Sequence, residues 1–400
     1  MIKIGILREG KVPIDERVPL TPEQLQSMCS ANPKLDVKVK RSEVRRIKDS
    51  EYQKLGIELA DSVEEQDILI GVKEVPKAEL IEGKTYFFFS HTIKMQPYNK
   101  RLLQEVMNKG ITLIDWECLR DARGRRLIGF GRYAGIVGTY NGLRAYGLKT
   151  ATFELKKAHN CIDRTEVSSE LKKVILPAIK ILLTGRGKVA KGALEILDEL
   201  GIRRVTVRDY LKQEFTEPVY CQISFSEYFK RKDGGEFQTK DFYSNPELFK
   251  SDFMRFAAVS DMYIAGHYWS SKSPFLFTRE DIRQPEFNIK LVADISCDID
   301  GPVACTIRPS SIDAPFYGYD PNSEKEVNYD APSAITVMAV DNLPCELPRD
   351  ASADFGAMFI RSILPSLLNG DKNGILDRAM ITSKGKITSK YKYLEAWVNS

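Results

Sequence analysis

Several features are scarce in this sequence, and each scarcity argues against a class of protein. The 400 residues include only three histidines, and the seven cysteines are scattered without a CxxC pair. A structural zinc site needs clustered Cys and His ligands, so we predict no metal site. An odd number of widely spaced cysteines is typical of reduced thiols in a cytoplasmic protein, which is the compartment we expect.

Long apolar runs and a strong net charge are also missing. No apolar run reaches the roughly 18–20 residues that cross a bilayer, and the opening MIKIGILREG lacks the apolar core of a signal peptide. The formal net charge is only +4, and basic runs such as KVKRSEVRRIKD are interrupted by acids. Such a run is typical of a solvated surface. We therefore expect neither a membrane nor a nucleic-acid partner.

The composition is that of a soluble globular protein with room for two domains. Hydrophobic residues make up 43% of the chain and charged residues 28%. In the first 135 residues, apolar runs (IKIGIL, ILIGVKEV, YFFFSHT, ITLIDWE) alternate with a helix-period segment, QPYNKRLLQEVMNKG. Alternating strands and helices predict a parallel α/β sheet. The small-residue-rich segment RYAGIVGTYNGLRAYGLK then predicts a helix leading into the next domain.

The main cofactor signal lies in PAIKILLTGRGKVAKGALEILDELGIRRVTVRD. An apolar run precedes Gly185, Gly187 and Ala190, which fit the G-x-G-x-x-G/A pattern of dinucleotide-binding folds. Gly185 would form the tight turn, and Gly187 would let the backbone approach a pyrophosphate at the helix N-terminus. Ala190 and Gly192 would let the helix lie close to the sheet. VTVRD predicts a second strand ending in Asp209, placed to bind the ribose hydroxyls of NAD.

Two further apolar runs, DMYIAGHYW and KLVADISCD, predict strands whose carboxyl ends face the same nucleotide. His267, beside two aromatic residues, fits a packed loop as well as a functional role. The charged and aromatic segment at about 225–260 has no clear period and reads as an insertion. The residues expected to bind the cofactor are Gly185, Gly187, Lys188, Val189, Asp209, Gly266, Asp294, Ser296 and Asp298.

The segment ITVMAVDNLPCELPRDASADFGAMFIRSILPSLL predicts a strand, a proline-punctuated turn and an amphipathic helix that return the chain to the first domain. The predicted fold is therefore α/β, with two Rossmann-like domains of parallel strands flanking a cleft. Residues 1–135, completed by about 335–400, form the first domain. Residues 136–334 form the dinucleotide-binding domain.

Seven motifs in order resemble one enzyme family. They are EGKVPIDERVPLTPEQ, GVKEVP, FFFSHTIKMQ, LIDWECLRDARGRRLIGFGRYAG, LLTGRGKVAKGA, VADISCD and AVDNLPCELPRDAS. Together they resemble the lysine-forming saccharopine dehydrogenases and the lysine–ketoglutarate reductase half of the bifunctional lysine-degrading enzyme. Both belong to the wider alanine dehydrogenase and transhydrogenase superfamily. FFFSHTIK and FGRYAG are more similar to the reductase half.

This resemblance implies an NAD(P)-dependent reaction that joins or splits L-lysine and 2-oxoglutarate through an imine, with saccharopine as the joined product. The family's acid/base pair corresponds to Lys73 in GVKEVP and His91 in FFFSHT, in the first, substrate-binding domain. An imidazole titrates near neutrality without help, whereas a lysine needs a lowered pKa to act as a base. The predicted substrate-binding residues are Arg17, Lys94, Glu117 and Arg126.

Several alternatives remain open at this point. Asp209 favours NAD because an acid repels a 2′-phosphate, but Arg204 and Arg208 are close in sequence and the family's reductase half uses NADPH. The direction of the reaction and the identity of the amine are open, so an opine-type enzyme or an amino-acid dehydrogenase that releases ammonia is an alternative. A nucleotide-binding protein without turnover would be expected to lose Lys73 and His91. A homo-oligomer is possible.

Overall fold

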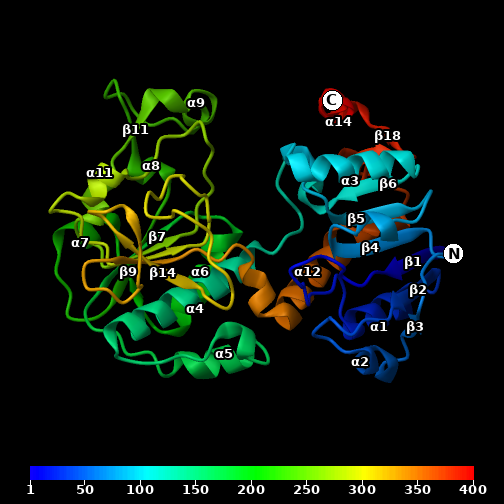
Figure 1. Ribbon diagram of the computed structural model, residues 1–400, viewed down its shortest axis with the longest axis horizontal. Coiled ribbons are helices and arrows are strands. Elements are labelled where there is room, and N and C mark those ends of the chain that lie inside the picture. The colour runs from blue at the N-terminus through cyan, green and yellow to red at the C-terminus, as the bar shows by residue number, and fades with distance from the viewer. The chain divides into compact units, whose positions relative to one another are not determined.

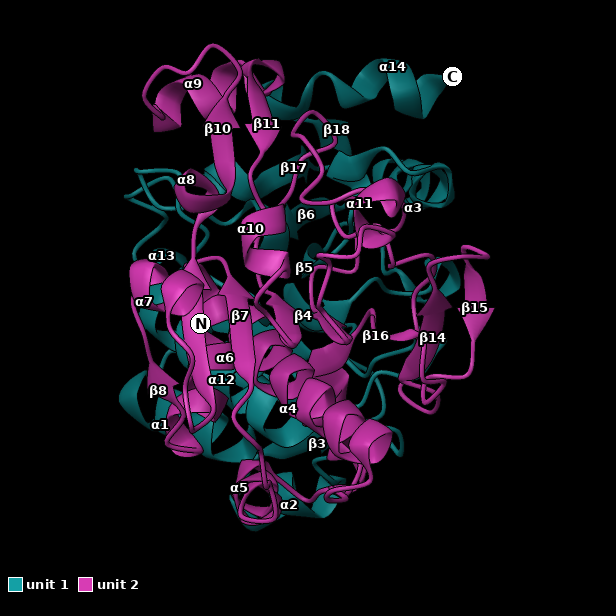
Figure 2. Ribbon diagram, turned by 90° about the vertical axis from the view of Figure 1, so that its left-hand side faces the viewer, with its two compact units in different colours: residues 1–130, 348–400 teal, residues 131–347 magenta.

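The computed structural model describes residues 1–400, which divide into two compact units. Unit 1 comprises residues 1–130 and 348–400, and unit 2 comprises residues 131–347 (Figure 2, teal and magenta). Of the segment predicted to complete the first domain from about residue 335, the strand β16 (Ile335–Met338) belongs to unit 2, and the return to unit 1 begins with α12 (Pro348–Ser362). No helix combines the length and the apolar character that crossing a bilayer requires.

Unit 1 is built on an eight-stranded sheet in the order β18-β17-β6-β5-β4-β1-β2-β3 (Figure 1). Its parallel strands are β1 (Ile2–Ile6), β2 (Leu35–Lys40), β3 (Glu58–Ala60), β4 (Ile68–Lys73), β5 (Thr85–Phe89) and β6 (Thr112–Asp115). Its helices are α1 (Pro22–Ala31), α2 (Asp49–Lys54), α3 (Pro97–Asn108), α12, α13 (Leu364–Leu368) and α14 (Leu394–Asn399). The all-parallel expectation is wrong at one edge, where β17 (Met380–Ser383) and β18 (Lys386–Ile387) run antiparallel.

Local sequence explains the ends of these elements. Thr21 and Gln24 form a reciprocal capping box at the start of α1, and proline follows at the first helical position. Helix α3 ends just before Gly110, whose φ of +61° favours glycine. Phe87 and Phe88 are fully buried in β5, because a strand covered on both faces has no polar side.

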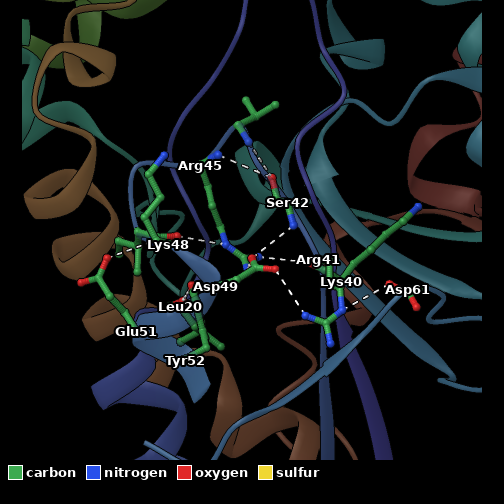
Figure 3. A network of polar contacts seen from close by, with 12 residues as sticks. Leu20, Lys40, Arg41, Ser42, Arg45, Lys48, Asp49, Glu51, Tyr52 and Asp61 are labelled. Carbon is green, nitrogen blue, oxygen red and sulfur yellow. Dashed lines mark hydrogen bonds and ion pairs between the residues drawn. The ribbon is translucent and has the colours of Figure 1, made fainter. Parts of the chain in front are cut away.

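The basic run at 38–49 is not simply a solvated face. The Arg45 guanidinium is 3% exposed and lies over the Tyr52 ring, 4.5 Å from its centroid. It bonds to Asp49 and to two backbone carbonyls, while Ser42 donates its amide to the same carboxylate (Figure 3). Arg41 pairs with Asp61 at 3.2 Å at the edge of this network. The network fixes the start of α2 against the loop after β2.

Unit 2 contains a second eight-stranded sheet in the order β15-β14-β16-β13-β12-β7-β9-β8. Its strands are β7 (Lys180–Thr184), β8 (Arg203–Arg204), β9 (Val219–Ile223), β12 (Met262–Ala265), β13 (Leu291–Asp294), β14 (Phe316–Asp320), β15 (Lys325–Val327) and β16. Here too one edge is antiparallel, at β14 and β15. Each unit thus contains a mostly parallel sheet with helices, which confirms the predicted α/β class.

Two helices of unit 2 pack at very short range. The predicted small-residue helix is α4 (Gly131–Thr150), and it lies against α6 (Lys188–Glu199). A Cβ on Gly135 would lie 1.9 Å from the Val189 carbonyl oxygen, and one on Gly192 would lie 1.9 Å from that of Arg132. Gly192 therefore serves the α4–α6 contact rather than the helix–sheet contact that we expected.

The segment at 225–260 has regular structure despite its irregular sequence. It holds α8 (Phe225–Tyr228), β10 (Phe229–Arg231), α9 (Thr239–Ser244), β11 (Phe249–Ser251) and α10 (Met254–Ala257). Strands β10 and β11 pair antiparallel as a separate small sheet. Phe242 packs between Phe225 and Phe229, with ring centroids 5.5 and 5.0 Å away. The remaining helices of the unit are α5 (Arg164–Leu171), α7 (Val207–Lys212) and α11 (Arg279–Ile282).

Candidate functional site

The chain order of unit 1 creates a switch point between β1 and β4. From β1 the chain builds β2 and β3 on one side, and it then builds β4, β5 and β6 on the other. In open parallel sheets, ligands bind outside the carboxyl ends of the strands at such a point. Lys73 ends β4, His91 follows β5, and Glu117 follows β6. Three predicted site residues thus lie along one edge of the sheet.

His91 is held in an unusual backbone conformation at the end of β5. Its φ is +54°, in the left-handed region, and its ring stacks on Phe89 with centroids 6.1 Å apart. The preceding residue, Ser90, donates its amide to Asp115 at 2.9 Å and its hydroxyl to the same carboxylate. Asn99 donates to the His91 carbonyl at 3.3 Å. A non-glycine residue at positive φ needs such support, and it is often found at functional positions.

Burial and neighbouring positive charges keep the His91 imidazole neutral. Burial, followed by the positive charges of Lys94 and Lys73, lowers the pKa of His91 to about 4, and the Glu117 charge only partly opposes this. The expectation that this histidine titrates near neutrality is therefore wrong for the ligand-free protein. The same result places the ammonium groups of Lys73 and Lys94 within electrostatic reach of the imidazole.

Glu117 has one carboxylate oxygen without a partner. It lies in the 3-10 turn Trp116–Cys118, where Asp115 accepts its amide at 2.6 Å. Its Oε1 faces Lys94 Nζ at 3.7 Å and Arg126 Nη1 at 3.8 Å, both longer than a hydrogen bond. Its Oε2 is buried and has no hydrogen-bond partner. An orphaned acceptor beside two loosely held cations is a feature that a cationic or polar ligand could complete.

The two arginines predicted to bind substrate carboxylates differ in how exposed they are and in how tightly they are already paired. Arg126 is 38% exposed, and its guanidinium carbon lies 5.4 Å from the centroid of the Phe89 ring. Arg17 is 2% exposed, makes two bonds to Asp15 at 2.9 and 2.6 Å, and lies 4.1 Å from the Phe130 ring centroid. Burial alone would raise the pKa of Asp15, but Arg17 outweighs it and lowers that pKa to about 2. In this structure Arg17 is part of a buried ion pair.

Glu9 is a residue of this edge that sequence reasoning missed. Its carboxylate accepts the amide of Val72 at 2.6 Å and that of Lys73 at 2.8 Å. Burial and the neighbouring Asp15 charge raise the pKa of Glu9 to about 8, against the lowering effect of those amides and of Arg17. Its position as a polar residue just after β1 was a signal that could have been used, because β1 lies next to β4.

Unit 2 has a matching switch point between β7 and β12. Gly185 follows β7 with φ +98°, and a Cβ there would lie 2.4 Å from the carbonyl oxygen of Gly266, which follows β12. Gly187 is the N-cap of α6 and makes no side-chain cap, while Lys188 and Val189 form the first turn. A Cβ on Gly187 would meet nothing within 4 Å. The glycine loop therefore leaves an open space beside a helix N-terminus.

The structure does not bear out the predicted strand ending in Asp209. The strand β8 contains only Arg203 and Arg204, and Asp209 lies in the first turn of α7. Its carboxylate accepts bonds from the Thr206 hydroxyl and the Gln213 side chain, both at 2.8 Å. The strand next to β7 is β9 instead. The two strands are parallel, and their pairing begins with Lys180 opposite Val219 and ends with Thr184 opposite Ile223. The β propensity of VTVRD did not produce a strand, because Thr206 caps the start of α7.

The acid that follows β9 is Glu227. Its Oε1 accepts a bond at 3.0 Å from Arg186, the residue between the two loop glycines. Its Oε2 accepts the amide and hydroxyl of Ser224, which completes the cap of α8. Glu227 thus touches the glycine loop directly.

Three other predicted cofactor residues lie at the end of β13 or in the loop after it. The Asp294 carboxylate is fully buried and accepts bonds from the Ser296 amide and hydroxyl, the Cys297 amide and the Thr306 hydroxyl. Asp294 and Ser296 therefore shape this loop through each other, and Asp298 lies further along it. Nowhere in the chain does a group of three His, Cys, Asp or Glu gather that could hold a metal ion.

His267 is packed behind the glycine loop. Its Nδ1 lies 2.9 Å from the Thr184 hydroxyl, its Nε2 is buried without a partner, and burial lowers its pKa to about 4. Of the two readings that the sequence left open, this geometry favours a packed loop residue.

Comparison with known proteins identifies relatives of this arrangement. Residues 5–137 match the family model described as "Alanine dehydrogenase/PNT, N-terminal domain". Over these residues the chain is similar to that family. Over 98% of its length it is 31% identical to alpha-aminoadipic semialdehyde synthase, mitochondrial, of Mus musculus, and it covers 47% of that protein. It spans about half the length of the curated relatives of this kind.

A second group of relatives has about the same length as this chain. Saccharopine dehydrogenase [NAD(+), L-lysine-forming] of Neurospora crassa is 24% identical, with 90% of both chains covered. The resemblance read from the seven motifs is confirmed by these matches. Among solved structures, an L-alanine dehydrogenase covers 99% of this chain with a TM-score of 0.67 at 15% identity, which supports the two-sheet fold.

Proposed function

We propose that this chain is a pyridine-nucleotide-dependent oxidoreductase that interconverts saccharopine with L-lysine and 2-oxoglutarate. The observation that carries the proposal is the cluster at the edge of the unit 1 sheet. There the orphaned Oε2 of Glu117, two loosely paired cations and the neutral His91 lie together. The similarity to enzymes with saccharopine dehydrogenase in their names supports the same reaction.

In this proposal the unit 1 side chains bind the substrates and move protons. The Glu117 carboxylate accepts hydrogen bonds from the lysine ε-ammonium, which satisfies its orphaned oxygen. Lys73 takes the proton that the amine must lose before it attacks the keto carbon. His91 protonates the carbinolamine oxygen so that it leaves as water, and in the reverse direction it accepts a proton from the attacking water.

The low pKa of His91 gives the keto acid a further role. A histidine with a pKa of about 4 is a ready proton acceptor at neutral pH but carries no proton to donate. The carboxylates of 2-oxoglutarate would pair with Lys94 and Arg126, which offsets part of the positive charge that disfavours the imidazolium. We therefore expect substrate binding to raise the pKa of His91 and so prepare it as an acid.

Unit 2 would hold the dinucleotide. The open space at Gly187, the close turn at Gly185 and the uncapped start of α6 fit a pyrophosphate, because helix N-termini attract anions. When bound, the nicotinamide supplies or accepts the hydride. The other cofactor residues of this proposal are Lys188, Val189 and Gly266, with Asp294 at the end of β13 and Ser296 and Asp298 in the loop after it.

We assign the choice between NAD and NADP to Glu227 and Arg186 rather than to Asp209. Glu227 follows the strand that neighbours β7, which is where an acid can reach ribose hydroxyls. Replacing Glu227 by Gln should lower the ratio of kcat/KM for NAD over NADP by about tenfold, because Arg186 loses its anion and can pair with a 2′-phosphate. The matched variant Asp209→Asn should leave the ratio unchanged, and the opposite pattern would restore Asp209 to the role.

The direct test follows the reduced cofactor by absorbance. Purified protein is mixed with saccharopine and either NAD or NADP, and then with lysine, 2-oxoglutarate and either reduced cofactor. Turnover supports the proposal, and the variants His91→Gln and Lys73→Met should lose roughly 10²–10⁴-fold in kcat. The control variants His159→Gln and Lys77→Met should keep wild-type rates.

Two outcomes would contradict the proposal. Full turnover in His91→Gln or Lys73→Met would exclude these side chains from the reaction. No turnover by the wild type in any mixture, with nucleotide binding intact, would mean that the amine or keto acid is wrong. A panel of amino acids and ammonia against 2-oxoglutarate and pyruvate would then separate an opine-type enzyme from an ammonia-releasing dehydrogenase.

A further inference from the structure

Strand β4 contains an irregularity just before Lys73. Ile70 pairs with Phe87 on β5, but Lys73 pairs with Phe89, so three steps along β4 match two steps along β5. One residue of β4 is therefore extra, as in a β-bulge. Bulges leave ladder groups unpaired and change the direction of the side chains that follow, often beside active sites.

Side chains from the segments that follow β1 and β6 hold this bulge. The strand β1 pairs with β4 only as far as Ile70, whose carbonyl accepts the Leu7 amide at 2.9 Å. Beyond that point the Glu9 side chain accepts the amides of Val72 and Lys73, at 2.6 and 2.8 Å. The buried Trp116 indole donates a hydrogen bond to the Gly71 carbonyl at 2.8 Å.

We propose that Glu9 is a positioning residue for Lys73. The Glu9 side chain binds the two amides at the end of β4 and so fixes the direction in which the Lys73 side chain leaves the sheet. This inference rests on the proposed function, in which Lys73 moves a proton. Glu9 has no role with the substrate in this scheme, because both of its oxygens are used by backbone amides.

The geometry explains why a carboxyl group is required at this position. Two N–H groups point at one side chain, and a carboxyl group offers an acceptor oxygen to each of them, also when it carries a proton. A glutamine has nearly the same shape but would set its own NH₂ against one of the two amides. Asp15 and Arg17 are the charged side chains that act on Glu9, and their pairing with each other is separate from the β4 contact.

The test compares Glu9→Gln with the matched control Glu79→Gln. Glu79 pairs with Arg8, the neighbour of Glu9, but its contacts are with cations and not with β4 amides. We expect Glu9→Gln to lower kcat roughly 100-fold while KM for each substrate stays within about threefold, because misplacement by about 1 Å costs about that much. The control should keep wild-type kcat, and nucleotide affinity should be unchanged in both variants.

A second measurement does not depend on the reaction. The rate at which an amine-acylating reagent labels Lys73 is followed by mass spectrometry between pH 6 and 10, with Lys77 as the internal reference. In Glu9→Gln this rate should change at least about fivefold, the equivalent of one net hydrogen bond. Should Glu9→Gln fold poorly, Glu9→Asp, which keeps the carboxyl group but is too short to reach both amides, should show the same change.

The outcomes separate this inference from the proposed function. Unchanged Lys73 labelling in the Glu9 variants overturns the positioning role, whether turnover falls or not. A wild type that is silent in every substrate mixture overturns the proposed function, while altered labelling would still support the hold of Glu9 on Lys73. Wild-type kcat in Glu9→Gln also overturns the inference.

Discussion

The substitution His91→Gln should change how the stability of the ligand-free protein depends on pH. In the folded protein the pKa of His91 is about 4, whereas an unfolded chain has the ordinary value of 6.5. Between these values the unfolded chain binds a proton that the folded protein does not bind. Stability due to this residue is therefore present above pH 6.5 and is lost as the pH falls toward 4.

The size of the effect follows from the two pKa values. Their difference corresponds to about 3 kcal/mol, of which about 2 kcal/mol is lost between pH 7.5 and pH 5. His91 is partly exposed, so solvent screening reduces the expected loss to about 1–2 kcal/mol. The glutamine variant lacks the titrating group and should not show this loss.

Glu9 contributes with the opposite sign. Its pKa is about 8 in the folded protein against 4.5 in the unfolded chain, so the folded protein holds a proton that the unfolded chain has released. Stability from Glu9 is therefore present below pH 4.5 and is lost as the pH rises toward 8. The wild type should show a shallow net slope from pH 5 to 7.5, and only the difference between wild type and variant isolates His91.

The assay is urea unfolding at pH 7.5 and pH 5.0, followed by the fluorescence of Trp116, which is buried in the same unit as His91. On acidification, the free energy of unfolding of His91→Gln should fall by about 1–2 kcal/mol less than that of the wild type. Equal losses in wild type and His91→Gln would refute the neutral, cation-flanked state of this histidine.

Three further substitutions test the packing, the glycine loop and the acid at the substrate site. Gly192→Ala places a Cβ 1.9 Å from the Arg132 carbonyl oxygen, so it should lower the unfolding free energy of unit 2 by about 3 kcal/mol, seen as a lower urea midpoint. An unchanged midpoint would argue against the close α4–α6 contact. Gly187→Ala meets nothing within 4 Å and should change stability by less than about 0.5 kcal/mol, yet weaken NAD(H) binding at least about tenfold in a fluorescence titration. Intact binding would move the pyrophosphate elsewhere. Glu117→Gln should raise KM for lysine by about 10- to 100-fold without changing KM for 2-oxoglutarate, since a charge-assisted hydrogen bond contributes about 1.5–3 kcal/mol. A matching rise for the keto acid would contradict its role with the amine.

Much of the secondary structure could be predicted because its signals are local. The apolar runs at β1, β4, β5, β6, β7, β12 and β13 are long enough to be recognised, and helix α3 has both its period and its terminating Gly110. Local signals failed where a cap competed with β propensity, as at Thr206, which starts a helix inside the predicted strand. They also failed at the antiparallel strands of the two edges, which are two to five residues long and too short to show a period.

In the candidate site too, the sequence predicted the residues that have local signals and missed those that depend on strand pairing. His91, Lys73 and Glu117 were identified because each stands at the end of an apolar run within a motif. Glu9 was missed because its role depends on β1 lying beside a bulge in β4, which is a pairing between residues more than sixty positions apart. Glu227 was missed because the choice of β9 rather than β8 as the neighbour of β7 is a decision of sheet order.

The sequence by itself determined the class of fold, the glycine loop and the residue types at the strand ends, because these depend on apolar period, on backbone freedom and on position within a motif. Only the tertiary structure decided which groups share an environment. It buried Arg45 within a run of charges, lowered the pKa of His91 by burying it beside two lysines, and brought the Glu9 side chain to the amide of Lys73. Burial and electrostatic coupling are properties of neighbours in space, and no linear pattern records them.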